Sequence, residues 1–458
     1  MVEYLGLLFS VALLIWLALR GVNIIFAALL CSIVVILTCG LPLGKSLTEY
    51  FSFGPLGAFT FAGKFFLLFA AGAMFGRVMG ESHAAASVAL ALIRKLGADR
   101  ALWITVLTCA LMTYGGVVIF VVIFAMYPLG LKLLQEADIP KRLFCAALAL
   151  GAATFTLTAL PGTPSIHNVI SSVALGTDLF AGGWLGILAG AIMFGAGMWY
   201  LERQRLAAKA SGEGFDPGPG DRISSIEADK YPLPALAILP LAAVLLTIIS
   251  PRVISMMLDP DVLAGGDGVL ELIRFANSEP ILWPSFALFG GTLMSVLLFP
   301  SIRPGCLNTI GDGVQDSIMP LINTSAVIGF GGVVTHTEGF QQFTRLMLDS
   351  GLPPLISMFL STSLVSGITG SASGGLQIFM QSMAPAYLAM GIPAEVLHRL
   401  ATMAAGGFDS LPHSGAVVAT LTITGLTHKQ AYRDMFVITV LIPVIATVVA
   451  MAAAALFY

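Results

Sequence analysis

The sequence predicts an all-α membrane protein that crosses the bilayer many times and is built from two inverted repeats. Of its 458 residues, 57% are hydrophobic and only 10% are charged, whereas roughly a quarter of the residues in an ordinary soluble domain are charged. Apolar runs of about twenty residues recur, and a helix of that length crosses the hydrocarbon core of a bilayer. The same order of runs, turns and prolines is found on both sides of the polar stretch 202–231, which indicates an internal duplication.

The first repeat, residues 1–201, begins with two apolar runs that follow directly on Glu3. Because no basic region precedes them, this end is expected to be a retained membrane anchor and not a cleaved leader. The expected elements are spans near 4–19, 22–40, 62–80 and 180–201, a surface stretch at 82–99, a re-entrant hairpin at about 101–131 and a broken helix at about 139–175.

The stretch 202–231 is expected to be a flexible cytoplasmic linker, because it is polar and rich in glycine and proline. The second repeat, residues 232–458, repeats the plan of the first. Its expected elements are spans near 233–250, 281–299, 318–336 and 431–457, a surface stretch at 338–351, a re-entrant hairpin at about 353–389 and a broken helix at about 392–425.

The placement of lysine and arginine predicts the orientation of the chain. If each hairpin returns without crossing, each repeat makes five crossings, and an odd number inverts the second repeat relative to the first. With the linker in the cytoplasm, sixteen of the twenty-two basic residues lie on the cytoplasmic side, as the positive-inside rule requires. The acidic loop 251–280 and both termini are then expected to face the periplasm. Six basic residues remain outside: Lys45, Lys64, Arg252, Arg274, Arg345 and Arg399.

Two segments are predicted to be helices that break within the membrane. Each opens with Ile-Pro, continues for about twenty residues and ends at Leu-Pro, namely Leu160-Pro161 and Leu411-Pro412. Proline removes a backbone donor and clashes with the preceding turn. Broken helices are tolerated in lipid only where the freed backbone groups line a cavity or meet a ligand. Two breaks in matching halves therefore indicate a solute and ion site near the bilayer midplane, and hence a secondary transporter.

The two hairpins are predicted to bring their tips to the same site. The first tip is Thr113-Tyr-Gly-Gly116, and the second is the glycine- and serine-rich run 367–375. Flanking arms of about ten to sixteen residues are short for a crossing, which favours hairpins that dip in and return. Glycine lets backbone amides approach a ligand, and helix starts direct partial positive charge toward it. The alternative is that these small residues only permit close helix packing.

The candidate site residues belong to the tips and the breaks. Candidate solute-binding residues are Gly115, Gly116, Thr163, Ser165, Asn168, Gly370, Ser371, Ser373, Gly374 and Ser414. Candidate ion-coupling residues are Asp409, His413 and His167, because ionisable groups within a membrane are costly and functional and histidine titrates near neutral pH. The alternative for Asp409 is a structural role as a helix cap. Three other histidines are expected to be ordinary surface residues near the interfaces: His83, His398 and His428.

No lysine or arginine lies at either predicted tip or break, so helix starts, hydroxyls and amides would hold an anionic solute. This suits a small monocarboxylate better than a phosphate or a polyanion. The chain has neither a Walker A nor an HExxH motif, and its five cysteines lack CxxC spacing. A GxSG protease site is also missing at Ser371–Gly374. We therefore expect no cofactor, no metal site and no enzymatic activity, with H⁺ or Na⁺ as the coupling ion.

Several segments resemble those of the gluconate:proton symporter (GntP) family. They are Leu160–Asn168, Gly370–Gly375, Asp409–Gly415 and Gly425–Lys429, and the resemblance covers nearly the whole chain. It implies the ion transporter superfamily fold, with paired re-entrant hairpins, a scaffold, a mobile transport domain, elevator-type movement and a homodimer. It also implies import of sugar acids or hydroxy acids, such as gluconate or 3-hydroxybutyrate, with protons. The second tip differs from the more valine-rich tip of gluconate carriers, which favours a short hydroxy- or ketocarboxylate.

The resulting hypothesis is a proton-coupled symporter for a small organic anion in a bacterial inner membrane. Na⁺-coupled uptake of a dicarboxylate is the alternative within transport. A channel or an intramembrane enzyme is a remote alternative. Besides the solute, the expected partners are the lipid bilayer and a second copy of the chain, and no nucleic acid.

Overall fold

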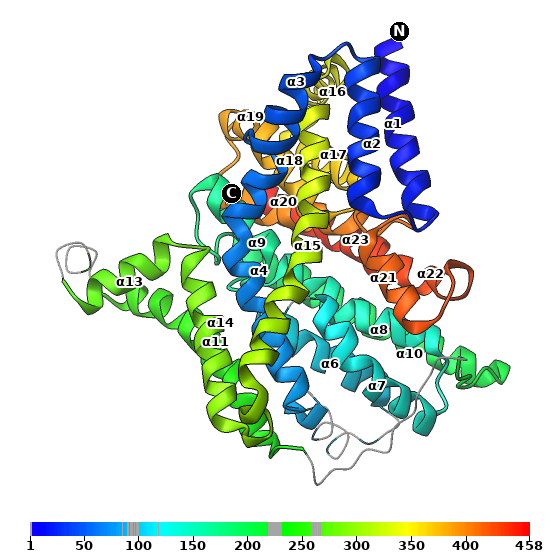
Figure 1. Ribbon diagram of the computed structural model, residues 1–458, viewed down its shortest axis with the longest axis vertical. Helices are drawn as coiled ribbons and strands as arrows, with labels where there is room; N and C mark the ends of the chain where they lie inside the picture. Colours follow the sequence, from blue (N-terminus) through cyan, green and yellow to red (C-terminus); the bar gives the residue numbers. More distant parts are fainter. Residues whose placement is uncertain are drawn as a thin grey trace.

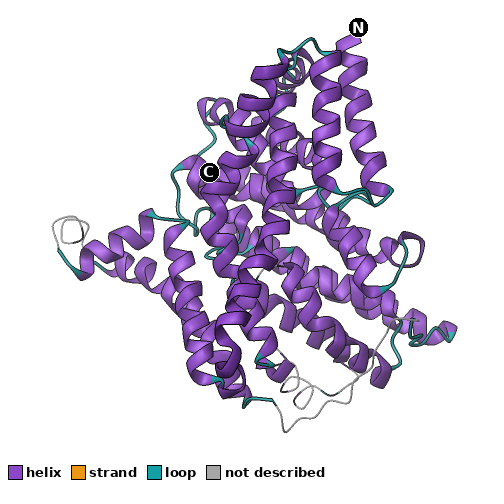
Figure 2. Cartoon of the chain, in the orientation of Figure 1, coloured by secondary structure: helices purple, strands orange, loops and turns teal. Residues whose placement is uncertain are grey.

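The computed structural model describes residues 2–84, 86–88, 91, 95, 97, 100–117, 119–218, 231–258, 263 and 267–458. Among these residues every regular element is a helix (Figures 1 and 2). The predicted all-α class is thereby confirmed for this part of the chain. Much of the predicted surface stretch 82–99 and residues 219–230 of the predicted linker lie outside the described residues.

The first half opens with α1 (Val2–Leu19) and α2 (Ile24–Thr38), which lie side by side in Figure 1. Asn23 begins α2, because its side chain accepts hydrogen bonds from two backbone N–H groups of the first turn. The other elements of this half are α3 (Leu43–Lys45), the π-helical η1 (Ser46–Phe53), α4 (Ala58–Glu81), α6 (Ala101–Tyr114), α7 (Ile119–Ala137), α8 (Lys141–Ala153), the π-helical η3 (Phe155–Ala159), α9 (Ile166–Leu175) and α10 (Gly183–Ser211).

The second half begins with two helices, α11 (Pro234–Met257) and α14 (Leu282–Leu298), which pack together with α13 (Val269–Ser278) between them in sequence. The 3₁₀ turn η5 (Pro300–Gly305) leads into the long helix α15 (Cys306–Val334). The remaining elements are α16 (Glu338–Leu348), α17 (Pro354–Thr369), α18 (Ala372–Ser382), α19 (Ala384–Ala389), α20 (Ala394–Phe408), α21 (Gly415–Thr424), α22 (His428–Phe436), η6 (Val437–Leu441) and α23 (Ile442–Phe457).

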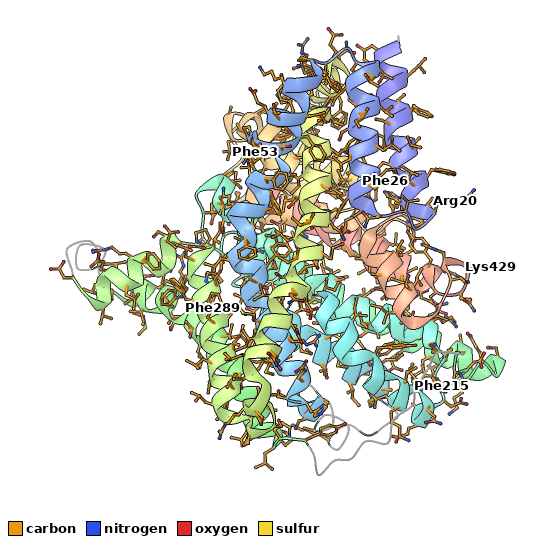
Figure 3. All side chains as sticks on the ribbon, viewed as in Figure 1. Arg20, Phe26, Phe53, Phe215, Phe289 and Lys429 are labelled. Carbon is orange, nitrogen blue, oxygen red and sulfur yellow. The ribbon has the colours of Figure 1, made fainter. Side chains whose placement is uncertain are left out.

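Within the described residues, six helical stretches are long and apolar enough to cross a membrane, or seven if α13 and α14, bent by 109°, count as one. They are Leu43–Glu81, Lys141–Ala159, Gly183–Ser211, Pro234–Met257, Pro300–Val334 and His428–Phe457. Six shorter apolar helices accompany them, and the ten crossings expected from the sequence remain a prediction. Large apolar side chains such as Phe26 (57% exposed) and Phe53 (69%) stay on the outside of the molecule (Figure 3), as a lipid-facing surface requires.

The structure corrects the start of the predicted linker. Helix α10 continues to Ser211, ten residues into the stretch 202–231, and ends where Gly212 adopts a left-handed conformation (φ 72°). Residues 202–211 contain mainly alanine, leucine, glutamate, glutamine, arginine and lysine, which are strong helix formers. Their polarity predicted a linker. Polar residues mark where the apolar span ends, but the helix itself continues through them.

Two other helices are longer than predicted for the same reason. Helix α15 begins at Cys306 instead of near residue 318, and α7 continues to Ala137 instead of 131. The additional turns of α15 are polar, and they carry Asp312 and Asp316, which face Arg77 of α4. The predicted outer loop 251–280 likewise contains the end of α11 and all of α13.

Helices α4 and α15 pack against each other through the centre of the molecule (Figure 1). Their backbones approach closely at Gly313, where an added Cβ would lie 2.7 Å from the Cα of Met74. Small residues allow such contacts between membrane helices. Arg77 reinforces the pair, because it forms ion pairs with Asp316 at 3.1 Å and Asp312 at 3.6 Å.

Gly313→Ala is expected to lower the melting temperature of the purified protein in detergent. The methyl group would meet the backbone of α4, which cannot move aside as a flexible side chain can, and overpacking of this kind costs about 1–3 kcal/mol. Gly311→Ala is the matched control, because a Cβ at Gly311 would meet nothing within 4 Å. Equal melting temperatures for the two variants would contradict the proposed close contact.

Candidate functional site

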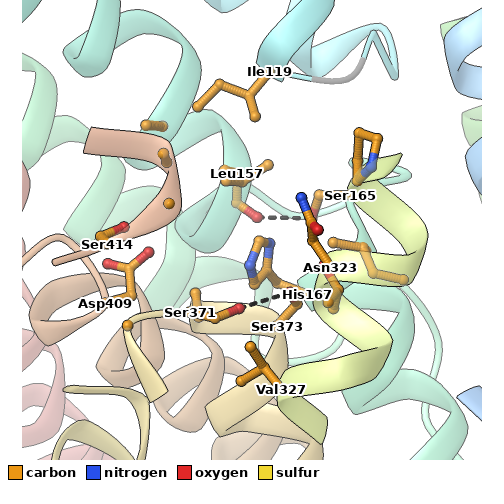
Figure 4. A pocket seen from close by; sticks show the side chains of 18 of the residues that line it. Ile119, Leu157, Ser165, His167, Asn323, Val327, Ser371, Ser373, Asp409 and Ser414 are labelled. Carbon is orange, nitrogen blue, oxygen red and sulfur yellow. Dashed lines mark hydrogen bonds between the residues drawn. The ribbon is translucent and has the colours of Figure 1, made fainter. Parts of the chain in front are cut away.

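A cavity of about 330 Å³ lies where the two helix breaks and the two predicted hairpin tips meet. The structure interrupts the helices at both predicted breaks, between η3 and α9 and between α20 and α21. The polar residues that line the cavity are Thr113, Ser165, His167, Asn323, Thr324, Thr369, Ser371, Ser373, Asp409, Ser410, His413 and Ser414. Figure 4 shows many of these side chains directed toward a common space.

Nine of the thirteen candidate residues from the sequence line this cavity: Gly116, Ser165, His167, Gly370, Ser371, Ser373, Asp409, His413 and Ser414. The other four, Gly115, Thr163, Asn168 and Gly374, are not among its lining residues. Gly115 is buried against Leu241, and Gly374 donates its backbone N–H to the Ser371 hydroxyl at 3.2 Å. Asn168 and Thr163 lie behind the first break and are fully buried.

Side chains hold the first break in an open conformation. The Asn168 amide donates to the carbonyls of Thr163 and Leu179, both at 2.9 Å. The Tyr114 hydroxyl donates to the Pro161 carbonyl at 2.8 Å. Ser165 caps α9, since its hydroxyl accepts from the Asn168 N–H at 3.3 Å. The carbonyls that the break removes from helical hydrogen bonding are thus satisfied by side chains, as buried backbone groups must be.

The second break is connected to the second tip. The Asp409 carboxylate accepts a hydrogen bond from the Ser410 hydroxyl at 3.0 Å, and it lies close enough to the backbone N–H of Ala372, at the start of α18, to interact with it. His413 donates through Nε2 to the carbonyl of Gly367 in the last turn of α17 at 2.9 Å. Gly370 turns the chain between these helices with a left-handed φ of 59°, which glycine adopts without strain.

Three helices of ten or eleven residues begin at the cavity wall. The first residues of α9, α18 and α21 include His167, Ser373 and Ala416, each of which lines the cavity. The N-terminus of a helix carries partial positive charge and N–H groups without intrahelical partners, so it binds anions. Three such starts favour a negatively charged guest, whereas the ends of α6, α17 and α20 and the Asp409 carboxyl group, which line the same cavity, favour a proton or another cation.

Three polar atoms of the lining are buried without a hydrogen-bond partner among the described residues: Thr113 Oγ1, His167 Nδ1 and Asn323 Oδ1. Buried polar groups in native proteins are nearly always hydrogen-bonded. A hydroxyl, an imidazole nitrogen and an amide oxygen without partners, on three residues that line one cavity, are therefore suited to bind hydroxyl groups of a guest when their side chains turn toward it.

Sequence reasoning missed Asn323 and Thr324 of α15 and placed the site on the breaks and tips alone. The signal was available, because these two polar residues follow one another inside the apolar span predicted at 318–336. Helix α15 passes the cavity without a break, although it contains Pro320, which also lines the cavity.

His398 and Arg399 of α20 were predicted to lie near or at the outer surface, and the structure shows that both are fully buried. His398 bridges the Thr177 hydroxyl and the Asn168 side-chain oxygen, both at 2.7 Å, an arrangement that a neutral ring satisfies. Arg399 reaches the Leu160 carbonyl at 3.5 Å, so an arginine does lie at the first break. Both side chains are hydrogen-bonded to residues from the other half of the chain. Their burial therefore cannot be predicted from the neighbouring sequence.

Comparisons with known proteins identify the family and the fold. The sequence matches the profile of GntP family permeases over residues 2–456. It is 38% identical to the uncharacterized transporter YxjC of Bacillus subtilis (strain 168) over 96% of both chains. An uncharacterized transporter of Haemophilus influenzae is 25% identical over 77% of this chain and 75% of its own. The fold is similar to the crystal structure of the Alcanivorax borkumensis YdaH transporter, with a TM-score of 0.55 and 15% identity over 91% of this chain and 88% of the other.

Asn168→Asp is expected to destabilise the protein, because a carboxylate of the same shape would place oxygen atoms against the Thr163 and Leu179 carbonyls. An unsatisfied buried group costs about 1–3 kcal/mol, which thermal unfolding in detergent would detect. Asn277→Asp is the control. The Asn277 amide also donates to two carbonyls, at 3.0 and 3.3 Å, but it is only partly buried and distant in sequence from both breaks. An Asn168 variant as stable as the Asn277 variant would argue against the amide clamp.

Proposed function

This chain belongs to the GntP permease family and is a multi-pass membrane transporter, and we propose that it is a proton-coupled symporter for a small organic anion. The proposed solutes are short hydroxy- or ketocarboxylates such as 3-hydroxybutyrate and, more broadly, gluconate-like sugar acids. The observation that carries the proposal is the meeting of three helix starts and one carboxyl group, Asp409, at a single cavity between two broken helices.

The cavity suits a small hydroxylated anion. Its volume of about 330 Å³ is at the lower end of ligand sites, which run from roughly 300 to 1,000 Å³. The starts of α9, α18 and α21 would bind the carboxylate. Thr113, Asn323 and His167 would then bind hydroxyl groups through the polar atoms that lack partners in the structure. No lysine or arginine is among the lining residues, so this site offers less to a dense polyanion.

Asp409 is the proposed proton carrier. No ion pair among the described residues includes it, and an unpaired acid within a membrane protein favours a functional role. Its carboxylate interacts with the N–H group of Ala372 at the start of α18. A solute carboxylate would compete for that helix start. Protonation of Asp409 weakens its hold on this N–H group, so proton binding and anion binding would support each other.

We also propose that the two halves are inverted repeats that form a scaffold and a mobile transport domain, that the domain moves as an elevator, and that the protein is a homodimer. The matching order of hairpin, break and following helix in the two halves supports the repeats. The α4–α15 pair is the proposed core of the scaffold. The proposed location is a bacterial inner membrane with both termini in the periplasm and the segment that follows Ser211 in the cytoplasm, as the distribution of basic residues favours.

Uptake by proteoliposomes tests the function directly. We expect an inward proton gradient, and not a Na⁺ gradient, to drive saturable accumulation of 3-hydroxybutyrate or gluconate. Accumulation of succinate driven by Na⁺ alone would favour the Na⁺-coupled dicarboxylate alternative. Conductance without saturable counterflow would indicate a channel, and conversion of the solute without a gradient would indicate an enzyme.

Asp409→Asn is expected to abolish accumulation driven by the proton gradient while preserving exchange of labelled for unlabelled solute. The asparagine imitates the protonated acid, so the site can bind its solute but can no longer exchange a proton. Gradient-driven uptake and counterflow are measured on the same proteoliposomes. Undiminished accumulation by the variant would remove Asp409 from the coupling mechanism.

Ser373→Ala and Asn323→Ala are each expected to raise the KM for uptake by about 5- to 30-fold, since a hydrogen bond is worth about 1–2 kcal/mol in such a site. Ser382→Ala is the matched control. It lies on the same helix as Ser373 but outside the cavity, and its hydroxyl is bound to the Ile378 carbonyl at 2.6 Å. If both site variants kept the KM of the control, the solute would not bind where we propose.

A further inference from the structure

Arg399 is the largest fully buried side chain in the described part of the molecule, with 0% of its surface exposed. It lies on α20 of the second half, yet its hydrogen-bond partners all belong to the first half. Its Nε donates to the Ala181 carbonyl at 3.1 Å, and its Nη2 donates to the Leu179 carbonyl at 3.2 Å. With the Leu160 carbonyl at 3.5 Å from Nη1, three carbonyls surround the guanidinium group.

The start of α10 leaves room for this side chain. A Cβ at Gly182 would lie 2.7 Å from the Cβ of Arg399, and a Cβ at Gly186 would lie 3.0 Å from its Cδ. The aliphatic part of Arg399 therefore passes directly over two glycines before the guanidinium group reaches the carbonyls. The side chain is fixed in a close-packed slot.

The positive charge of Arg399 has no ion-pair partner within 4 Å among the residues that the structure describes. Asp178 is close enough to interact electrostatically, but its carboxylate is paired with Arg252 at 2.9 Å. The adjacent His398 is occupied by two neutral partners. Burial of a charge is costly unless it is paired, and one carboxylate shared by two arginines compensates only part of their charge, so a further anion near Arg399 would be favourable.

The cavity is the space in which such an anion would bind. Leu160 begins the first break, and Pro164 and Ser165 of the same break line the cavity. Arg399 itself is not a lining residue, and it contacts the break at Leu160, four residues before Pro164. Electrostatic interactions act over longer distances where water is excluded, so a cation that contacts the break outside the cavity still attracts an anion inside it.

We infer that Arg399 provides the counter-charge that selects a negatively charged solute, and that it acts from behind the first break without contacting the solute. This inference rests on the proposed function and goes beyond it, because the sequence predicts anion binding only by helix starts, hydroxyls and amides. Arg399 acts through its electric field, and it makes solute charge, not only solute shape, a condition of binding.

The test compares two variants and two solutes in proteoliposome counterflow at neutral pH. Arg399→Lys keeps the charge, whereas Arg399→Gln removes it, and both alter the three carbonyl contacts. The solutes are 3-hydroxybutyrate and its uncharged amide. We expect Arg399→Gln to raise the KM for the acid by on the order of tenfold without raising the KM for the amide, and Arg399→Lys to keep the preference for the acid. Equal effects of both variants on both solutes would reduce Arg399 to a structural brace and overturn the inference.

Arg252→Gln provides a second test in a variant that leaves the buried slot intact. Arg252 is 37% exposed, and its loss would leave the Asp178 carboxylate free to offset the charge of Arg399. The KM for the acid should rise while that for the amide stays unchanged, and Arg345→Gln on the exposed face of α16 is the control. An unchanged KM for the acid would contradict the inference. Wild-type protein that transports neither solute would instead overturn the proposed function itself.

Discussion

Backbone groups that leave a helix inside a membrane protein must find partners within the protein, and this requirement organises the centre of the molecule. At the first break, the partners are Tyr114, Asn168 and Arg399, which donate to carbonyls at or beside the break. At the second break, the Tyr432 hydroxyl donates to the Ser410 carbonyl and His428 donates to the Pro412 carbonyl. Both breaks are held open from behind, which leaves their cavity side available to a solute.

One partner of the first break, Arg399, comes from the second half of the chain, so the two halves depend on each other. Helix α20 belongs to the second half but supports the first break through His398 and Arg399. Residues of α22 support the second break, and α22 in turn packs against α8, the helix that precedes the first break. A displacement of α20 in the second half would therefore alter the first break, and a displacement of α8 in the first half would alter α22 and with it the second break.

Prolines and small polar residues allowed the breaks to be located from the sequence. Pro161 and Pro412 lie at breaks, but Pro240, Pro251 and Pro320 lie inside continuous helices, so proline alone does not end a helix. The glycine, serine and histidine residues that follow the Leu-Pro pairs made the difference, since they can replace helical hydrogen bonds. Helix lengths were less predictable, because α10 and α15 continue through polar turns whose partners lie elsewhere in the fold. The burial of His398 and Arg399 depends on contacts across more than two hundred residues, which no local pattern records.

Asn323 lies on a different part of the structure from most other polar residues of the cavity. It lies on α15, which packs along α4, whereas His167, Ser373 and Asp409 lie on the breaks and the second tip. The proposed binding site is therefore divided between α15 and the segments that form the breaks and the tips. If the breaks and tips slide along α15 as one unit, the solute travels with them and loses Asn323 on the way. The affinity for the solute would then fall as a direct result of the displacement, and no separate release step would be needed.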